Sequence, residues 1–349
     1  MNSSAAFPAA HADAIGEVSP PPSSVPTQGG RIRHRRIGAL IDDVGLLLDG
    51  GKSSTLLLVC GPAGAGKSTL GKYLVEAELV AQRAEMVTDP GFLPAIRVEA
   101  PASGEKEFSW RLLYERILSA LEGDLDAPRT TYGVDPRTGR VVGGPVPQPN
   151  RLGGLRTAVE RTLRQRRTQF IVLDEFAHVM NQCPPNRHLA QLDTLKSLSN
   201  ECGVQWVLLG SYDLFNLLSL SGQIARRTHV LHFSRYREDD EADVQTFRSC
   251  VAKFAETLPA LAAVDLPAYA HILHANTLGC IGTLRDILVR LSIMVAARGW
   301  STEVFHAALM SDAQVQQILQ EVTDGEERIA PGLKHSRAGG PSTAHRRIA

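Results

Sequence analysis

The feature that most constrains the fold is a short glycine-rich segment directly after an apolar run. Residues 55–60 (TLLLVC) are continuously apolar, which is typical of a buried parallel strand. The next eight residues match G-x-x-x-x-G-K-[ST] at every fixed position: Gly61, Pro62, Ala63, Gly64, Ala65, Gly66, Lys67 and Ser68. Residues 67–81 then have a helical pattern. A strand, a phosphate-binding loop and a helix in this order predict a P-loop α/β fold.

Each residue type in this loop has a chemical reason to be there. Glycines let the main chain curl, so that the amides of residues 64–67 can point at phosphate oxygens. Lys67 supplies a positive charge for the outer phosphates, and the Ser68 hydroxyl, with Thr69 beside it, can serve Mg²⁺. A plain glycine turn is the alternative, but it would not require Lys and Ser in register. The segment therefore predicts binding of ATP or a related nucleotide with Mg²⁺.

A second chemical signal is the segment 170–175 (FIVLDE), in which four apolar residues end in two carboxylates. An acid at the carboxyl end of a buried strand can hold the Mg²⁺ water shell, and we assign this role to Asp174. Glu175 could orient a water that attacks the γ-phosphate. A solvated turn is the alternative. The pair favours an ATPase, which cleaves ATP to ADP and phosphate, over a protein that only binds the nucleotide.

The pattern of strands and helices gives the expected architecture. Apolar runs at 55–60, 95–98, 170–173, 204–210 and 229–233 alternate with helical segments such as 108–121, 155–166, 189–200 and 214–225. We predict a parallel five-stranded sheet with helices on both faces, over residues 31–237. After this point only helical patterns occur, at 240–255, 266–276, 281–297, 301–309 and 312–322. They predict a small all-helical lid over residues 238–325.

The remaining segments are expected to lie outside the folded regions. Residues 1–30 lack Lys and Arg and are rich in Ala, Ser and Pro, so we expect a disordered leader. Residues 326–349 are expected to form a basic disordered tail, and residues 122–154, rich in Pro and Gly, a loop insertion. The apolar runs are too short to span a membrane. Five cysteines without a C-x-x-C pair fit a reducing compartment, so we expect a cytoplasmic protein.

Three arginines and one serine are further candidates for contact with the nucleotide. Arg226 and Arg227 precede the last predicted strand, and Arg285 lies in Gly-Thr-Leu-Arg near the start of a lid helix. An arginine can stabilise the charge on a transferring phosphate. Surface salt bridges are the simpler alternative for all three. Ser211 follows another strand and could be a plain turn residue.

The order of these elements resembles the AAA+ ATPases. The segments 191–201 (QLDTLKSLSNE), 208–211 (LLGS) and 223–227 (QIARR) resemble, more narrowly, the TniB/TnsC-type transposition ATPases. By that resemblance Ser211 senses the γ-phosphate, Arg227 or Arg226 acts on a neighbouring subunit's nucleotide, and Arg285 contacts the nucleotide of its own subunit. The segment 31–37 (RIRHRRI) resembles the one that lies near the adenine.

The resemblance also implies a biological role. Members of that group are bacterial, assemble with ATP on double-stranded DNA as homo-oligomeric rings or filaments, and pass the DNA to a DDE transposase, in some cases with an adaptor protein. Contact with the DNA backbone would come from loops, and Lys106 and Arg111 are the candidates, although ordinary surface charge is the alternative. A nucleotide-gated signalling or scaffold ATPase, of the STAND or helicase-loader kind, that acts on a protein partner also stays open.

Overall fold

The computed structural model describes almost three quarters of the chain. These residues are 32–49, 56–102, 104, 107–122, 133–134, 141–142, 152–219, 222 and 228–329. The predicted leader, the tail beyond residue 329 and most of the 122–154 insertion lie outside them, and the ends of that insertion belong to helices that end at Glu122 and begin at Leu152. Within the insertion, two short strands, β3 (Gly133–Val134) and β4 (Val141–Val142), pair antiparallel.

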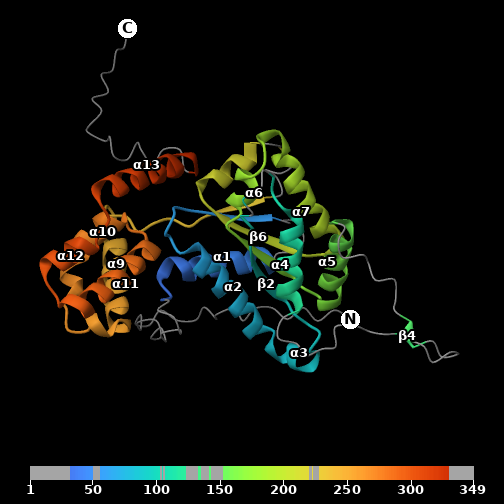
Figure 1. Ribbon diagram of the computed structural model, residues 1–349, viewed down its shortest axis with the longest axis horizontal. Helices are drawn as coiled ribbons and strands as arrows, with labels where there is room; N and C mark the ends of the chain where they lie inside the picture. Colours follow the sequence, from blue (N-terminus) through green and yellow to red (C-terminus); the bar gives the residue numbers. More distant parts are fainter. Residues whose placement is uncertain are drawn as a thin grey trace, which may run out of the picture.

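The centre of the molecule is a five-stranded parallel sheet (Figure 1). Its strands in chain order are β1 (Leu56–Cys60), β2 (Ala95–Glu99), β5 (Phe170–Asp174), β6 (Gln205–Gly210) and β7 (Thr228–His232). In space the order is β2-β5-β6-β1-β7. Every strand predicted from an apolar run is present, with bounds that differ by one or two residues. The loops after β1, β5 and β6 therefore meet at one edge of the sheet, where ligands bind in open parallel sheets.

Helices cover both faces of this sheet, as predicted. One face packs against α1 (Arg35–Asp49) and α2 (Lys67–Ala81) through an apolar cluster that includes Val44, Val59 and Leu70. The other face carries a second cluster with α4 (Trp110–Glu122), α5 (Leu152–Arg166) and α7 (His188–Cys202). Short helices α3 (Arg83–Thr88) and α6 (Ala177–Asn181) and the 3-10 turn η1 (Pro185–Arg187) join these elements. Helix α1 was not predicted.

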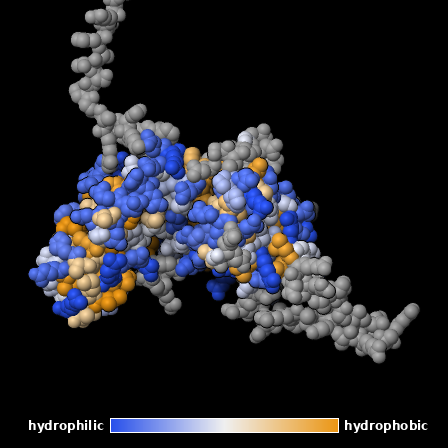
Figure 2. All heavy atoms as spheres, turned by 45° about the horizontal axis from the view of Figure 1, so that its top comes forward, coloured by the Kyte–Doolittle hydropathy of each residue, from blue (hydrophilic) through white to orange (hydrophobic). Residues whose placement is uncertain are grey.

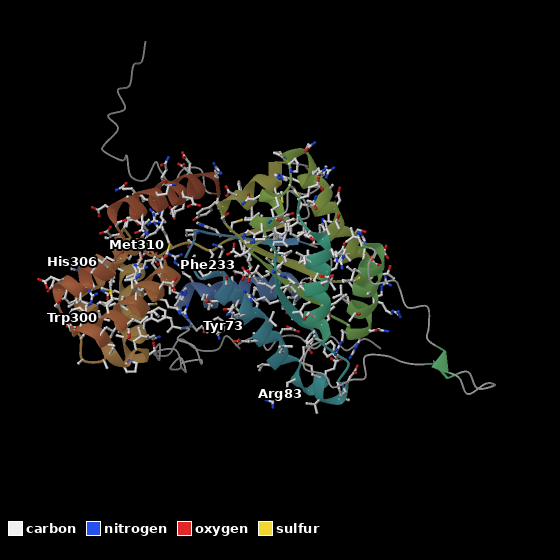
Figure 3. The ribbon with its side chains drawn as sticks, viewed as in Figure 1. Tyr73, Arg83, Phe233, Trp300, His306 and Met310 are labelled. Atoms are coloured by element: carbon white, nitrogen blue, oxygen red, sulfur yellow. The ribbon has the colours of Figure 1, made fainter. Side chains whose placement is uncertain are left out.

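The C-terminal helices form a separate lobe with a core of its own (Figure 1). The helices are α9 (Glu241–Thr257), α10 (Ala270–Thr277), α11 (Ile281–Arg298), α12 (Thr302–Ala308) and α13 (Asp312–Ile329), with the 3-10 turns η3 (Pro259–Leu261) and η4 (Leu266–Tyr269). Side chains cap two of them, since Asp240 accepts from the first amides of α9 and Ser301 from Val304 of α12. Figure 3 places Trp300 and His306 at the outer end of this lobe.

Two predictions about this part of the chain need correction. The lid does not end at residue 325, because α13 continues to Ile329. Its last turns pack on the sheet domain, where Arg235 and Glu326 form an ion pair with side chains only 10% exposed each. The segment 214–225 is not one α-helix, since residues Tyr212–Ser219 form the 3-10 helix η2.

The surface differs between the two lobes. Figure 2 shows apolar surface gathered on the lobe of C-terminal helices, whereas the visible face of the sheet domain is largely hydrophilic. Ile293 of α11 is 66% exposed and its helical neighbour Val289 is 37% exposed. In the described ranges, no helix combines the length and the apolar character that crossing a membrane requires.

Candidate nucleotide-binding site

The glycine-rich loop joins β1 to α2 and needs its glycines for two different reasons. Gly66 has φ of 109° and Gly64 has φ of 74°, values that side chains with a Cβ rarely adopt. A Cβ on Gly61 would lie 2.4 Å from the carbonyl oxygen of Phe233, which Figure 3 shows between the sheet and the helical lobe. The local structure is thus the curled loop that the motif predicts.

Main-chain amides at the start of α2 are the anion-binding groups of this loop. The first amides of a helix, here from Lys67 onward, have no acceptor inside the helix and carry the positive end of its dipole. The amide of Ala65 differs from the prediction, because it donates to the carbonyl of Pro62 at 3.2 Å within the loop.

Lys67 folds back over the loop. Its Nζ donates to the carbonyl oxygens of Gly61 at 3.0 Å and Pro62 at 2.8 Å. Burial lowers the pKa of Lys67, and the carboxylates of Glu175 and Asp174 act in the opposite direction. The lysine and the two predicted acids therefore lie in one electrostatic environment, although they are far apart in the sequence.

The two carboxylates at the end of β5 lie in different settings. Asp174 is 2% exposed; its Oδ2 pairs with Nη2 of Arg97 at 2.5 Å, and its Oδ1 accepts the Glu175 N–H at 3.0 Å. Glu175 has φ of 53°, a left-handed conformation that costs a residue with a Cβ about 1–2 kcal/mol. Such a conformation in a residue next to a candidate ligand is typical of functional sites.

Arg97 was missed by the sequence analysis. It is the middle residue of β2, whose sequence is AIRVE, and β2 pairs with β5. The available signal was a cation between apolar residues of a strand, since a partly buried charge requires a partner.

Ser211 follows β6, the strand that lies between β1 and β5. It is therefore at the same sheet edge as the loop and Asp174. Its hydroxyl lies 3.4 Å from Oδ2 of Asp213, and its carbonyl accepts from Leu214 at the start of η2. A contact between Ser211 and a nucleotide stays a prediction.

The lid touches the phosphate-binding loop directly. The amides of Gly282 and Thr283, in the first turn of α11, donate to the carbonyl of Gly64 at 2.6 and 3.2 Å. Arg285 begins the next turn of α11; its side chain is 45% exposed and its Nη1 lies 3.8 Å from Oδ1 of Asp286. A contact between Arg285 and the nucleotide stays a prediction.

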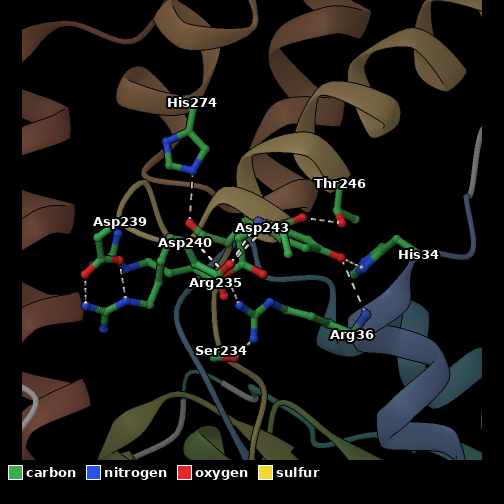
Figure 4. A network of polar contacts seen from close by, with 12 residues as sticks. His34, Arg36, Ser234, Arg235, Asp239, Asp240, Asp243, Thr246 and His274 are labelled. Carbon is green, nitrogen blue, oxygen red and sulfur yellow. Dashed lines mark hydrogen bonds and ion pairs between the residues drawn. The ribbon is translucent and has the colours of Figure 1, made fainter.

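A polar network joins the segment before α1 to the linker after β7 (Figure 4). His34 Nδ1 lies 2.8 Å from the Tyr236 hydroxyl, and Arg36 contacts Ser234 and pairs with Asp243 of α9. Burial, followed by the charge of Arg36, lowers the pKa of His34 to about 4, so the imidazole is neutral at pH 7. The predicted adenine-side segment therefore lies where the sheet domain meets the lid.

Three other candidates cannot be placed at the site. Arg226, Arg227 and Lys106 lie outside the described residues. Arg111 is on α4, where it pairs with Glu115 one turn away at 3.0 Å and is 55% exposed. It is available to solvent but has the setting of an ordinary surface charge.

The donor set fits a magnesium ion held together with a nucleotide. Ser68 and Asp174 offer a hydroxyl and a carboxylate, the oxygen ligands that Mg²⁺ prefers. Among the described residues, no group of three or more His, Cys, Asp or Glu side chains could hold a metal by itself. A P-loop site needs no such group, because phosphate oxygens and water complete the coordination.

Comparison with known proteins agrees with this geometry. Residues 51–218, just under half of the chain, match the family model described as AAA domain. No curated protein sequence matches the chain.

Two similar solved structures are from Aeropyrum pernix. The ORC2 protein, in ADPNP–ADP complexes, has a TM-score of 0.51 at 18% identity over 79% of this chain and 67% of that one. The ORC1 protein in complex with DNA has a TM-score of 0.51 at 19% identity over 78% of this chain and 63% of that one. This chain thus spans about two thirds of the length of each. It has the P-loop AAA+ fold, with an AAA domain in residues 51–218 and a helical C-terminal region.

Proposed function

We propose that the chain binds ATP with Mg²⁺ and hydrolyses it. The observation that carries this proposal is the strand order β5-β6-β1, which puts the loop that ends in Lys67 and the end of β5, with Asp174 and Glu175, at one sheet edge, together with the hydrogen bonds from α11 to the same loop. Loop amides and Lys67 would bind the phosphates, and Ser68 and Asp174 would hold Mg²⁺, which neutralises phosphate charge. Glu175 would orient the attacking water. Ser211, Arg285 and Arg227 or Arg226 complete the proposed site.

Two substitutions and a control test this proposal. Lys67→Ala should abolish ATP binding, since it removes the cation for the outer phosphates. Glu175→Gln should retain binding and slow turnover by about 100-fold or more, since a general base contributes this much. Lys72→Ala, on the exposed side of the same helix, is the control and should behave like the wild type. ATP binding that survives in Lys67→Ala would contradict the assignment.

We further propose that ATP binding lets the chain assemble on double-stranded DNA, mark it as a target and activate a partner DDE transposase. The support is the resemblance of residues 191–201, 208–211 and 223–227 to the TniB/TnsC-type pattern, together with the DNA complex formed by the structurally similar ORC1 protein. Assembly would bring Arg227 or Arg226 of one subunit to the nucleotide of the next. Lys106 and Arg111 are the proposed contacts with the DNA backbone.

A second candidate is a nucleotide-gated scaffold that acts on a protein partner. The exposed apolar residues Val289 and Ile293 on α11 favour it, because they follow the turn that contacts the P-loop. ATPase rate with and without duplex DNA separates the two. Stimulation by DNA, with assemblies of Glu175→Gln on DNA seen by electron microscopy, supports the first candidate. A rate and an oligomeric state that ignore DNA would exclude it.

A further inference from the structure

Arg97 is a charged residue beside the apolar cluster on one face of the sheet. In the parallel register Arg97 lies opposite Val172, and Glu99 lies opposite Asp174. Side chains alternate along a strand, so Arg97, Val172 and Asp174 share the face covered by α2. Val172 belongs to the apolar cluster on that face.

The contacts of Arg97 converge on the candidate magnesium ligand. Its Nη2 pairs with Oδ2 of Asp174 at 2.5 Å, with side chains 24% and 2% exposed. The methylene part of the side chain passes over α2, where a Cβ on Gly71 would lie 3.6 Å from Arg97 Cδ. In the described residues, the buried Nε of Arg97 has no hydrogen-bond partner.

Asp174 also contacts the next residue in the chain. Its second oxygen accepts the N–H of Glu175, the residue with φ of 53°. One guanidinium thus holds a carboxylate, and that carboxylate holds the main chain that carries the proposed general base. An apolar pair on this face would avoid the desolvation of two charges, so stability alone does not explain the arginine.

We propose that Arg97 is a positioning residue for the reaction at this site. It fixes the Asp174 carboxylate toward the phosphate-binding loop and, through Asp174, the main chain of Glu175. This inference rests on the proposed ATPase function. The contact is a single charged hydrogen bond from Nη2 to Oδ2, and the planar guanidinium directs it better than the freely rotating ammonium group of a lysine would.

The test compares Arg97→Met and Arg97→Lys with the control Arg116→Met. Arg116 is exposed and donates to the carbonyl of Glu99 at the end of the same strand, without contact to Asp174. A fluorescent ATP analogue is titrated in EDTA and in Mg²⁺, and kcat and KM are measured. Circular dichroism and thermal unfolding establish that each variant is folded.

In Arg97→Met the Mg²⁺-free affinity should stay within about twofold, since the loop amides and Lys67 are intact. The gain in affinity on adding Mg²⁺ should be lost, and kcat should fall by about 10- to 100-fold, the effect of a misplacement on the order of 1 Å. Arg97→Lys should lie between Arg97→Met and the wild type, and Arg116→Met should match the wild type. If Arg97→Met does not fold, the same measurements on Arg97→Lys test the positioning role of Arg97.

A folded Arg97 variant with the wild-type Mg²⁺ gain and wild-type kcat would overturn the inference. So would an equal loss of affinity with and without Mg²⁺, which would indicate a purely structural role. The wild-type protein separates this inference from the function on which it rests. If the wild type binds no analogue, the proposed function fails; if it binds and the variants match it, only the role of Arg97 fails.

Discussion

The contact between Gly282 and the phosphate-binding loop can be broken by one methyl group. A Cβ on Gly282 would lie 2.6 Å from the carbonyl oxygen of Gly64 and 3.1 Å from its carbon, so the start of α11 must move away in Gly282→Ala. The movement weakens the hydrogen bonds from Gly282 and Thr283 to Gly64. Two such bonds contribute about 1–3 kcal/mol together.

The control for this variant is Gly153→Ala. Gly153 is the second residue of α5, as Gly282 is the second residue of α11, and a Cβ there meets no atom within 4 Å. Both substitutions gain up to about 1 kcal/mol of helix propensity. Gly153→Ala should therefore be neutral or stabilising, whereas Gly282→Ala should shift the lid toward the open form by about 5- to 150-fold relative to it.

Hydrogen exchange measures this equilibrium directly. Faster exchange is expected at the first amides of α11 in Gly282→Ala, with the α5 amides unchanged, together with weaker binding of an ATP analogue. Equal exchange and equal affinity in the two variants would show that the lid does not rely on this contact, and the reasoning from the Gly64 carbonyl would be wrong.

Two other predictions concern the junction between the lobes. Because the pKa of His34 is lowered from 6.5 to about 4, protonation favours the unfolded chain, and stability that is fully present above pH 6.5 is lost as the pH falls toward 4. Between pH 7.5 and 5, the free energy of unfolding measured in urea should fall by about 2 kcal/mol less in His34→Gln than in the wild type. An identical fall in both proteins would contradict the burial of a neutral imidazole. Glu326→Ala leaves Arg235 buried without its ion-pair partner and should lower the free energy of unfolding by about 3 kcal/mol, measured in the same assay. The exposed control Glu321→Ala should change the free energy of unfolding by less than about 0.5 kcal/mol. A similarly small change in Glu326→Ala would contradict the contribution to stability that we infer for the Arg235–Glu326 ion pair.

The sheet and the phosphate-binding loop were predictable because their signals are local. Apolar runs of five or six residues mark the buried strands, and the loop motif requires glycines at the positions where the main chain is left-handed or crowded. Helix α2 begins at Lys67, as the motif requires. The placement of Ser211 next to the loop followed only from the resemblance to AAA+ proteins, because strand order in a sheet depends on long-range pairing.

The parts that were missed depend on contacts between distant residues. Arg97 and Asp174 are 77 positions apart, and no local pattern links them. Likewise, the start of the tail was predicted at residue 326 from composition. In the structure, α13 continues past this residue, and the ion pair between Glu326 and Arg235 of the linker holds it in place. In the segment 214–225 the apolar periodicity was real, but the described part from Tyr212 onward forms a 3-10 helix against α13.

In the described residues, the lid contacts the sheet domain at three places, and each involves an element assigned to the proposed nucleotide site. Helix α11 donates hydrogen bonds to the carbonyl of Gly64 in the loop, and Asp243 of α9 forms an ion pair with Arg36. Gly325 of α13 packs against Tyr212, the residue after Ser211. A rigid lobe held at three points cannot rotate without disturbing all of them. We therefore expect that a change at the proposed phosphate site would move the lid as a unit and carry the surface with Val289 and Ile293 to a new position relative to the sheet domain.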